Sequence, residues 1–191
     1  MSSKVDIVNQ ALMMLGASPI ISFDDESTEA NAVRILYDPA KRQLLRSFDW
    51  NCACITAQPA LLTDPPVDPN YVAAFSVPSD SLRIIEIFEM GSPQYRRVEW
   101  EIQGNKLLTR TQKVLIRYVS NIAEPNLDSH VEMALVARMA MDLAYAITAD
   151  SGREGQMAQI FQQKLNEAMI TDAQERSHKN IRIDQFEWVR I

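Results

Sequence analysis

Cys52 and Cys54 stand one residue apart and are the first candidates for chemistry in this chain. On a strand both side chains would point the same way, but residues at this spacing are poorly placed to form a disulfide. A metal site of the Cys-x-Cys type needs further ligands at matched spacing, and the sequence shows none. We therefore expect reduced structural thiols, which suggests assembly in a cytoplasm.

Four acidic residues fall within the run 24–29 and could form a loop that binds a divalent cation. A calcium loop requires regularly spaced oxygen ligands and a central glycine, and this run has no glycine. The same run suits the start of a helix, because acids stabilise the positive end of the helix dipole and Ser27 or Thr28 can cap free N–H groups. The sequence predicts a helix N-terminus here, and no metal site.

Other residue types that carry out catalysis are widely scattered. His130 and His178 are distant from each other and from the cysteines, and neither a Gly-x-Ser-x-Gly motif nor a glycine-rich phosphate loop is present. Glu99 and Glu101 could cleave a glycan only if a cleft brought the sugar between them. We expect no catalytic residue, no cofactor and no enzymatic activity.

The overall composition argues against two classes of partner. The 191-residue chain has 47% apolar and 23% charged residues, as an ordinary globular protein does. Its net charge of -6 disfavours binding through DNA phosphates, which needs clustered Lys and Arg. No apolar run reaches the ~18 residues of a membrane span. We expect neither specific nucleic-acid binding nor membrane insertion.

Helical patterns occupy the first part of the chain. Apolar residues recur on one face of residues 3–15, with Ser2 or Ser3 as a cap and Gly16 at the exit. A second pattern runs to about Phe48. Pro39 lies within it and should either kink the helix or restart it, with Asp38 as the new cap.

Short runs punctuated by proline follow Trp50 and read as strands. The candidates are 52–58, 71–77, 82–89, 95–103, 106–110 and 113–120. The turn Gln103-Gly104-Asn105 should form a tight hairpin, because glycine accepts the left-handed backbone that such turns need. Five or six such strands predict a small antiparallel sandwich or barrel.

Two more helices are expected after Pro125. Asp128 or Ser129 should cap the first, which is apolar on nearly every side from 131 to 147 and must be surrounded by other helices or by neighbouring subunits. Gly152 and Gly155 suggest a break, followed by an amphipathic helix over about 154–175. The predicted fold is α+β, with a helical bundle domain from 1–50 and 121–176 and an inserted antiparallel β-domain from 51–120.

The final segment, 177–191, mixes basic and large apolar residues, whereas chain termini are usually polar. Trp and Arg are favoured anchors at interfaces, so we predict an arm that docks on a partner. The alternative is an arm that folds back on its own domain. The residues expected to dock are Ile181, Arg182, Ile183, Phe186, Trp188 and Arg190.

Four segments together resemble the head-to-tail adaptor proteins of short-tailed bacteriophages, the tail tubular protein A-like family. The resemblance covers roughly residues 5–173 and depends on the order and spacing of the segments, since each alone is weak. They are Asn9-Gln10-Ala11-Leu12 with Leu15-Gly16 and Pro19-Ile20; Tyr37-Asp38-Pro39-Ala40-Lys41-Arg42 with Leu44-Leu45-Arg46 and Trp50-Asn51; Val77-Pro78-Ser79-Asp80 with Leu82-Arg83; and Tyr118, Asp128, Leu143, Ala144 and Ile147-Thr148.

The resemblance implies a homo-oligomeric ring of twelve copies in the neck of the virion, assembled in the host cytoplasm. Such a ring would lie between the portal protein and a tail nozzle protein, and double-stranded DNA would pass through it without specific binding. We expect the arm to meet the portal. We expect two loops to face the nozzle, through Asp64, Pro65, Pro66 and Asp68 in the first and Ser92 and Pro93 in the second.

Other functions remain open from the sequence. The chain could be a neck or stopper protein of a long-tailed phage, although its length and inserted sheet disfavour that reading. It could be a small hydrolase that cleaves cell-wall glycan during phage entry. A DNA-binding regulator is disfavoured by the acidic charge.

Overall fold

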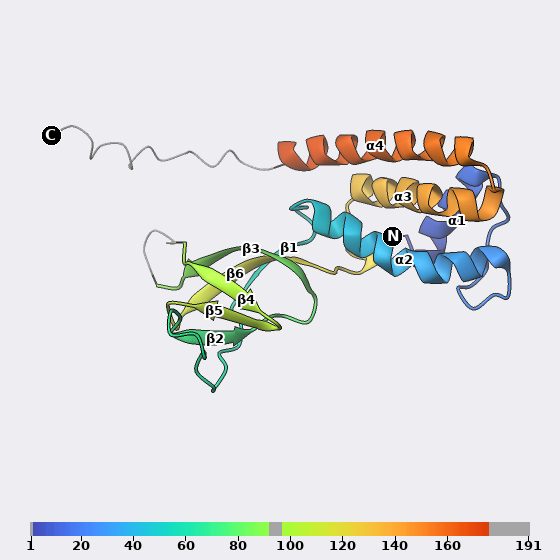
Figure 1. Ribbon diagram of the computed structural model, residues 1–191. Coiled ribbons are helices and arrows are strands. Elements are labelled where there is room, and N and C mark those ends of the chain that lie inside the picture. The colour runs from blue at the N-terminus through green and yellow to red at the C-terminus, as the bar shows by residue number, and fades with distance from the viewer. Residues whose placement is uncertain (1, 92–96, 176–191) are drawn as a thin grey trace.

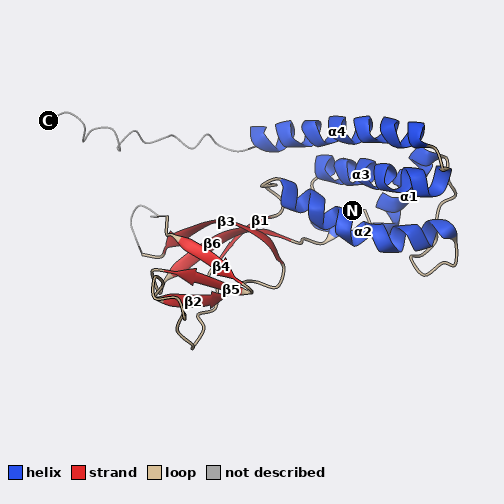
Figure 2. Ribbon diagram, viewed as in Figure 1, coloured by secondary structure: helices blue, strands red, loops and turns tan. Residues whose placement is uncertain are grey.

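The described residues form four α-helices and two small antiparallel sheets, so the fold is mixed α+β (Figures 1 and 2). The computed structural model describes residues 2–91 and 97–175. In chain order the elements are α1 (Lys4–Leu15), α2 (Thr28–Ser47), β1 (Cys54–Ala57), β2 (Ala73–Ser76), β3 (Ser81–Glu89), β4 (Trp100–Gln103), β5 (Lys106–Thr109), β6 (Val114–Ser120), a 3-10 turn (Glu124–Asn126), α3 (Ser129–Thr148) and α4 (Ser151–Gln174).

Helix α1 begins and ends as its sequence predicts. The Ser3 hydroxyl accepts a hydrogen bond from the backbone N–H of Asp6, and the Asp6 carboxylate accepts one from the Ser3 N–H. At the other end Gly16 adopts the left-handed conformation, with φ of 72°. The side-chain amide of Asn9 then bonds both the carbonyl and the N–H of Ile20 at 2.9 Å, which holds the following loop against the helix.

Helix α2 confirms that the acidic run precedes a helix, because the Ser27 hydroxyl caps it by accepting from the Ala30 N–H. Of the two outcomes predicted at Pro39, a kink or a restart, the restart at Asp38 does not occur, since one helix runs through Pro39. A proline inside a helix loses one backbone hydrogen bond. Here the ring is exposed while Tyr37 and Ala40 are buried, so packing of the opposite face keeps the helix continuous.

Helix α3 is the central helix, and α1, α2 and α4 each pack against it (Figure 1). Asp128 caps it as expected, and the chain's own helices cover most of its apolar surface. The expected break before α4 is misplaced. Asp150 caps a helix that starts at Ser151, so Gly152 and Gly155 both lie inside it.

The strands form two three-stranded sheets, with strand orders β1-β6-β3 and β2-β5-β4 and antiparallel pairing throughout. Gly104, with φ of 63°, makes the predicted hairpin between β4 and β5. Cys52 lies in a turn before β1, so the two cysteines do not share a strand, and both are half-buried.

Buried side chains form two separate apolar clusters. The larger one joins the four helices and includes Trp50, which is fully buried and donates its indole N–H to the carbonyl of Leu44. The smaller one contains residues of both sheets, among them Phe75 and Leu107 from one and Ile87 and Ile116 from the other. The two sheets therefore pack face to face around a core of their own.

Candidate interaction surfaces

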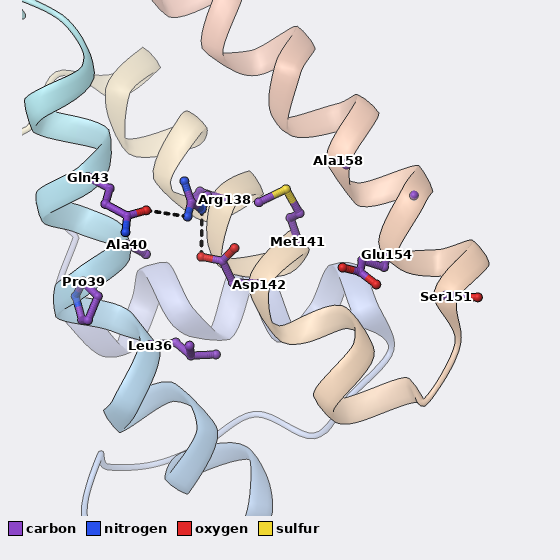
Figure 3. A pocket seen from close by; sticks show the side chains of 11 residues that line it. Leu36, Pro39, Ala40, Gln43, Arg138, Met141, Asp142, Ser151, Glu154 and Ala158 are labelled. Atoms are coloured by element: carbon purple, nitrogen blue, oxygen red, sulfur yellow. Dashed lines mark hydrogen bonds and ion pairs between the residues drawn. The ribbon is translucent and has the colours of Figure 1, made fainter.

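A groove of about 610 Å³ runs between α2 and α4, with α3 as its floor (Figure 3). Each helix contributes residues spaced three or four apart, which places them on one face of that helix. The lining residues are Leu36, Pro39, Ala40 and Gln43 of α2, Arg138, Met141 and Asp142 of α3, and Ser151, Glu154, Gly155 and Ala158 of α4.

Arg138 of α3, at the floor of the groove, contacts residues of both α2 and α4. Its Nε donates to the Asp142 carboxylate one turn along α3, and its Nη2 donates to the Gln43 side-chain oxygen on α2, both at 2.8 Å (Figure 3). The guanidinium also lies 5.6 Å from the ring centroid of Phe161 on α4, within cation–π range. One half-buried side chain thus bridges three helices.

Small residues form part of each wall of the groove. Ala40, Gly155 and Ala158 leave space between the helices, and a Cβ added at Gly155 would meet no other atom within 4 Å. The exposed Glu154 side chain makes no ion pair or hydrogen bond with any residue that the structure describes. The groove is therefore open, partly apolar and slightly acidic.

The groove was not predicted from the sequence. In the sequence Arg138 and Asp142 stand out only as polar positions on an otherwise apolar helix. Their i, i+4 spacing indicates an ion pair, but nothing local shows that Gln43, ninety-five residues away, completes it. Gly155 by itself suggests a break in the helix, and nothing local in the sequence indicates that it lines a depression.

The last turn of α4 is fastened to the chain that follows α2. The Asp172 carboxylate accepts the backbone N–H of Asn51 at 2.7 Å, and the Asn51 side-chain amide donates to the Asp172 carbonyl at 2.8 Å. Asp172 is buried. This pair fixes the end of α4, from which residues 176–191 continue.

A buried charged pair joins α2 to the 3-10 turn before α3. Lys41 Nζ lies 2.8 Å from the Glu124 carboxylate, and the Tyr37 hydroxyl donates to the same oxygen. Burial alone would raise the pKa of Glu124, but the hydrogen bonds from Lys41 and from backbone outweigh it and hold this pKa below its usual value. Burial, together with the nearby Glu124, raises the pKa of Tyr37 strongly.

The first loop expected to face the nozzle lies at the end of the strand region remote from the helices (Figure 1). Asp64 and Pro65 are exposed, while Pro66 and Asp68 are half-buried. Val67 between them is fully exposed, with a relative accessibility of 101%. Ser92 and Pro93 of the second loop lie outside the described residues, as does every residue predicted to dock in the arm.

Within residues 2–91 and 97–175 the candidates for chemistry have different partners, and His178 lies outside these ranges. Glu99 forms an ion pair with Arg110 and lines a shallow hollow of about 350 Å³, whereas Glu101 accepts a hydrogen bond from Tyr71. His130 is exposed in the first turn of α3. Burial raises the pKa of the Cys52 thiol. Within residues 2–91 and 97–175, no three His, Cys, Asp or Glu side chains are placed to hold a metal ion.

Across the same ranges, none of the helices combines the length and apolar character needed to cross a bilayer. Comparison of the chain with protein-family models finds no match. Comparison with curated proteins finds no match either.

Proposed function

We propose that this chain is a structural head-to-tail adaptor of a short-tailed phage or prophage. Copies would form a ring between portal and tail nozzle and line the channel through which DNA leaves. One observation carries the proposal: several residues on which the family resemblance rests make the contacts that join helices to loops and strands. The resemblance therefore concerns residues that determine the architecture.

In the helical part, these contacts involve the first two resembling segments. Asn9 holds the loop at Ile20 through two hydrogen bonds, and Gly16 supplies the left-handed turn between them. Tyr37 and Lys41 both bond Glu124, just before α3. These residues set how α1, α2 and α3 meet, which supports a shared fold.

Near the junction of helices and strands, residues of the second, third and fourth resembling segments make the contacts. Asn51 bonds Asp172 of α4, and Arg83 on β3 forms an ion pair with Asp49 after α2. Asp80 accepts hydrogen bonds from the hydroxyls of Ser120, at 2.6 Å, and Tyr118. The chain after α2 is thereby held to β3, and the turn before β3 is held to β6.

We propose the domain division that the adaptor reading implies: a helical bundle domain from 1–50 and 121–176, with a β-domain from 51–120 inserted in it. The two apolar clusters support this division, since one is built chiefly from helices and the other from strands. Ala53 and Val119 belong to the larger cluster, so the boundary would lie a few residues inside the strand region.

In this proposal two separate segments of the chain meet different partners. The loop 64–68, in which Val67 is fully exposed, is remote from the helices and would contact the nozzle. The arm 177–191 would contact the portal. An acidic protein can surround moving DNA without holding it, because like charges oppose adhesion.

Co-purification with portal rings tests the proposal. The full-length protein is mixed with its portal and passed over a size-exclusion column, and the stoichiometry of the complex is measured by mass. We expect the protein to elute with the portal in a defined ring stoichiometry. Elution at its own monomer position, at every concentration tried, would rule the adaptor function out.

A further inference from the structure

None of the described residues occupies the groove between α2 and α4, and the groove is large enough to bind a side chain or a peptide. Its volume of about 610 Å³ falls within the ~300–1,000 Å³ typical of pockets that enclose a ligand. Small residues line one wall, while Leu36 and Met141 offer half-buried apolar surface. The exposed Glu154 at the rim adds negative charge with no partner within residues 2–91 and 97–175.

The charge of the chain is divided unequally along its length. Residues 176–191 contain four basic and two acidic side chains, a net charge of +2 with histidine neutral. The whole chain has 19 basic and 25 acidic side chains, which leaves 15 basic and 23 acidic ones, a net charge of -8, on residues 1–175. The final segment is therefore complementary in charge to the rest of its own chain.

The length of the final segment matches the distance to the groove. The groove residue Ala158 lies seventeen residues before Glu175, which is about 25 Å along a helix at 1.5 Å per residue. Phe186 follows Glu175 by eleven residues, and an extended chain of that length spans up to about 36 Å. Because the Asn51–Asp172 pair fixes the end of α4, the segment starts from a defined point.

We propose that residues 181–191 bind in the groove of their own chain before assembly. Phe186 and Trp188 are the anchors, since aromatic side chains bury about 150–250 Å² each and a pocket walled by small residues can admit them. The neighbouring Arg182 and Arg190 face the acidic rim at Glu154. The segment becomes available to another protein only when that protein displaces it from the groove. This contact does not depend on the adaptor function.

Labelling of the full-length protein with fluorotryptophan tests this contact. The chain has three tryptophans, so fluorine NMR gives three signals, and the one lost in Trp188→Phe belongs to Trp188. We expect the Trp188 signal to be displaced from that of free fluorotryptophan and shielded from solvent. A signal at the free position, fully open to solvent, would overturn the proposal.

A matched pair of variants locates the binding site. Gly155→Leu places a side chain in the groove, whereas Gln156→Leu adds the same side chain at an exposed position on α4 that does not line it. Both changes suit a helix, and circular dichroism verifies folding. The Trp188 signal should move to the free position in Gly155→Leu alone; the same response in both variants would contradict the assignment.

Dilution separates the chain's own groove from that of a second copy. Binding within one chain leaves the Trp188 signal unchanged on dilution, because both partners are on the same molecule. A signal that returns to the free position as the protein is diluted would instead mean that the segment binds a neighbouring copy, and the proposal in its present form would be wrong.

Discussion

Asp172, in the last turn of α4, accepts the backbone N–H of Asn51, 121 residues earlier in the chain. The Asn51 side chain returns a second hydrogen bond to the Asp172 carbonyl. The first residues after α2 and the last residues of α4 are therefore fixed together. The strand region and the final segment of the chain both start from this point.

Asp172→Ala should destabilise the protein by about 1–3 kcal/mol, because the Asn51 N–H would lose its partner in a mostly buried place. Urea unfolding measures the change. Asn166→Ala is the control, since Asn166 is exposed on the same helix and bonds only Gln162; its effect should stay within about 0.5 kcal/mol. Equal losses in the two variants would argue against a role for the Asn51–Asp172 pair.

Removing one member of the buried Lys41–Glu124 pair should cost more than removing both. Lys41→Met leaves the Glu124 carboxylate buried without its ammonium partner, a change that typically costs about 3–5 kcal/mol. In the double variant with Glu124→Leu, much of that loss should be recovered. Urea unfolding of all three proteins gives the comparison, and a double variant weaker than Lys41→Met would be inconsistent with this explanation.

The same pair predicts a dependence of stability on pH in the acid range. The pKa of Glu124 is lower in the folded protein than its usual value of 4.5. Its ionised form therefore stabilises the fold above that value, and this contribution is lost as the pH falls through the lower folded pKa. The wild type should lose stability more steeply below pH 4.5 than the double Lys41→Met, Glu124→Leu variant does. Parallel curves would refute the prediction.

Pro39→Ala should stabilise the protein. Alanine restores the backbone hydrogen bond that proline removes from the middle of α2, where an internal proline costs about 3 kcal/mol. Some of this gain is offset by the greater freedom of the unfolded chain, about 0.4–1 kcal/mol. We expect a net gain of about 2 kcal/mol in thermal or urea unfolding. A loss of stability would mean that the proline packs in a way that its exposure does not suggest.

Deleting residues 177–191 should abolish binding to the portal and leave the fold intact, because residues 4–174 already contain all four described helices and the larger apolar cluster. Pull-down with immobilised portal measures the binding, and circular dichroism measures the fold. Trp188→Ala and Phe186→Ala are finer variants of the same test. Undiminished portal binding by the shortened protein would show that another surface makes the contact.

Local signals were readable from the sequence. Ser3, Gly16 and Asp128 were predicted as caps because capping depends on residue type and on the next few residues. The alternation of apolar residues likewise located the strands of both sheets. Pro39 and Gly155 both lie inside helices, although each residue type lowers the stability of a helix. Packing of α2 and α4 on α3 outweighs that loss, and this packing depends on distant residues.

The candidate surfaces could not be predicted from local sequence signals. The groove needs Gln43, Arg138 and Phe161 from three helices, and the sequence does not show which of their faces meet. The partners Lys41 and Glu124 are likewise 83 residues apart. Two loops and a terminal segment were proposed from composition alone, and only the first loop lies in the part of the chain that the structure describes.

Negative-stain imaging of the protein mixed with its portal tests the adaptor proposal most directly. The account predicts an added ring of density on the tail-facing side of the portal. This ring is built from copies of this chain and has an open central channel. Portal particles that look the same with and without the protein would contradict it.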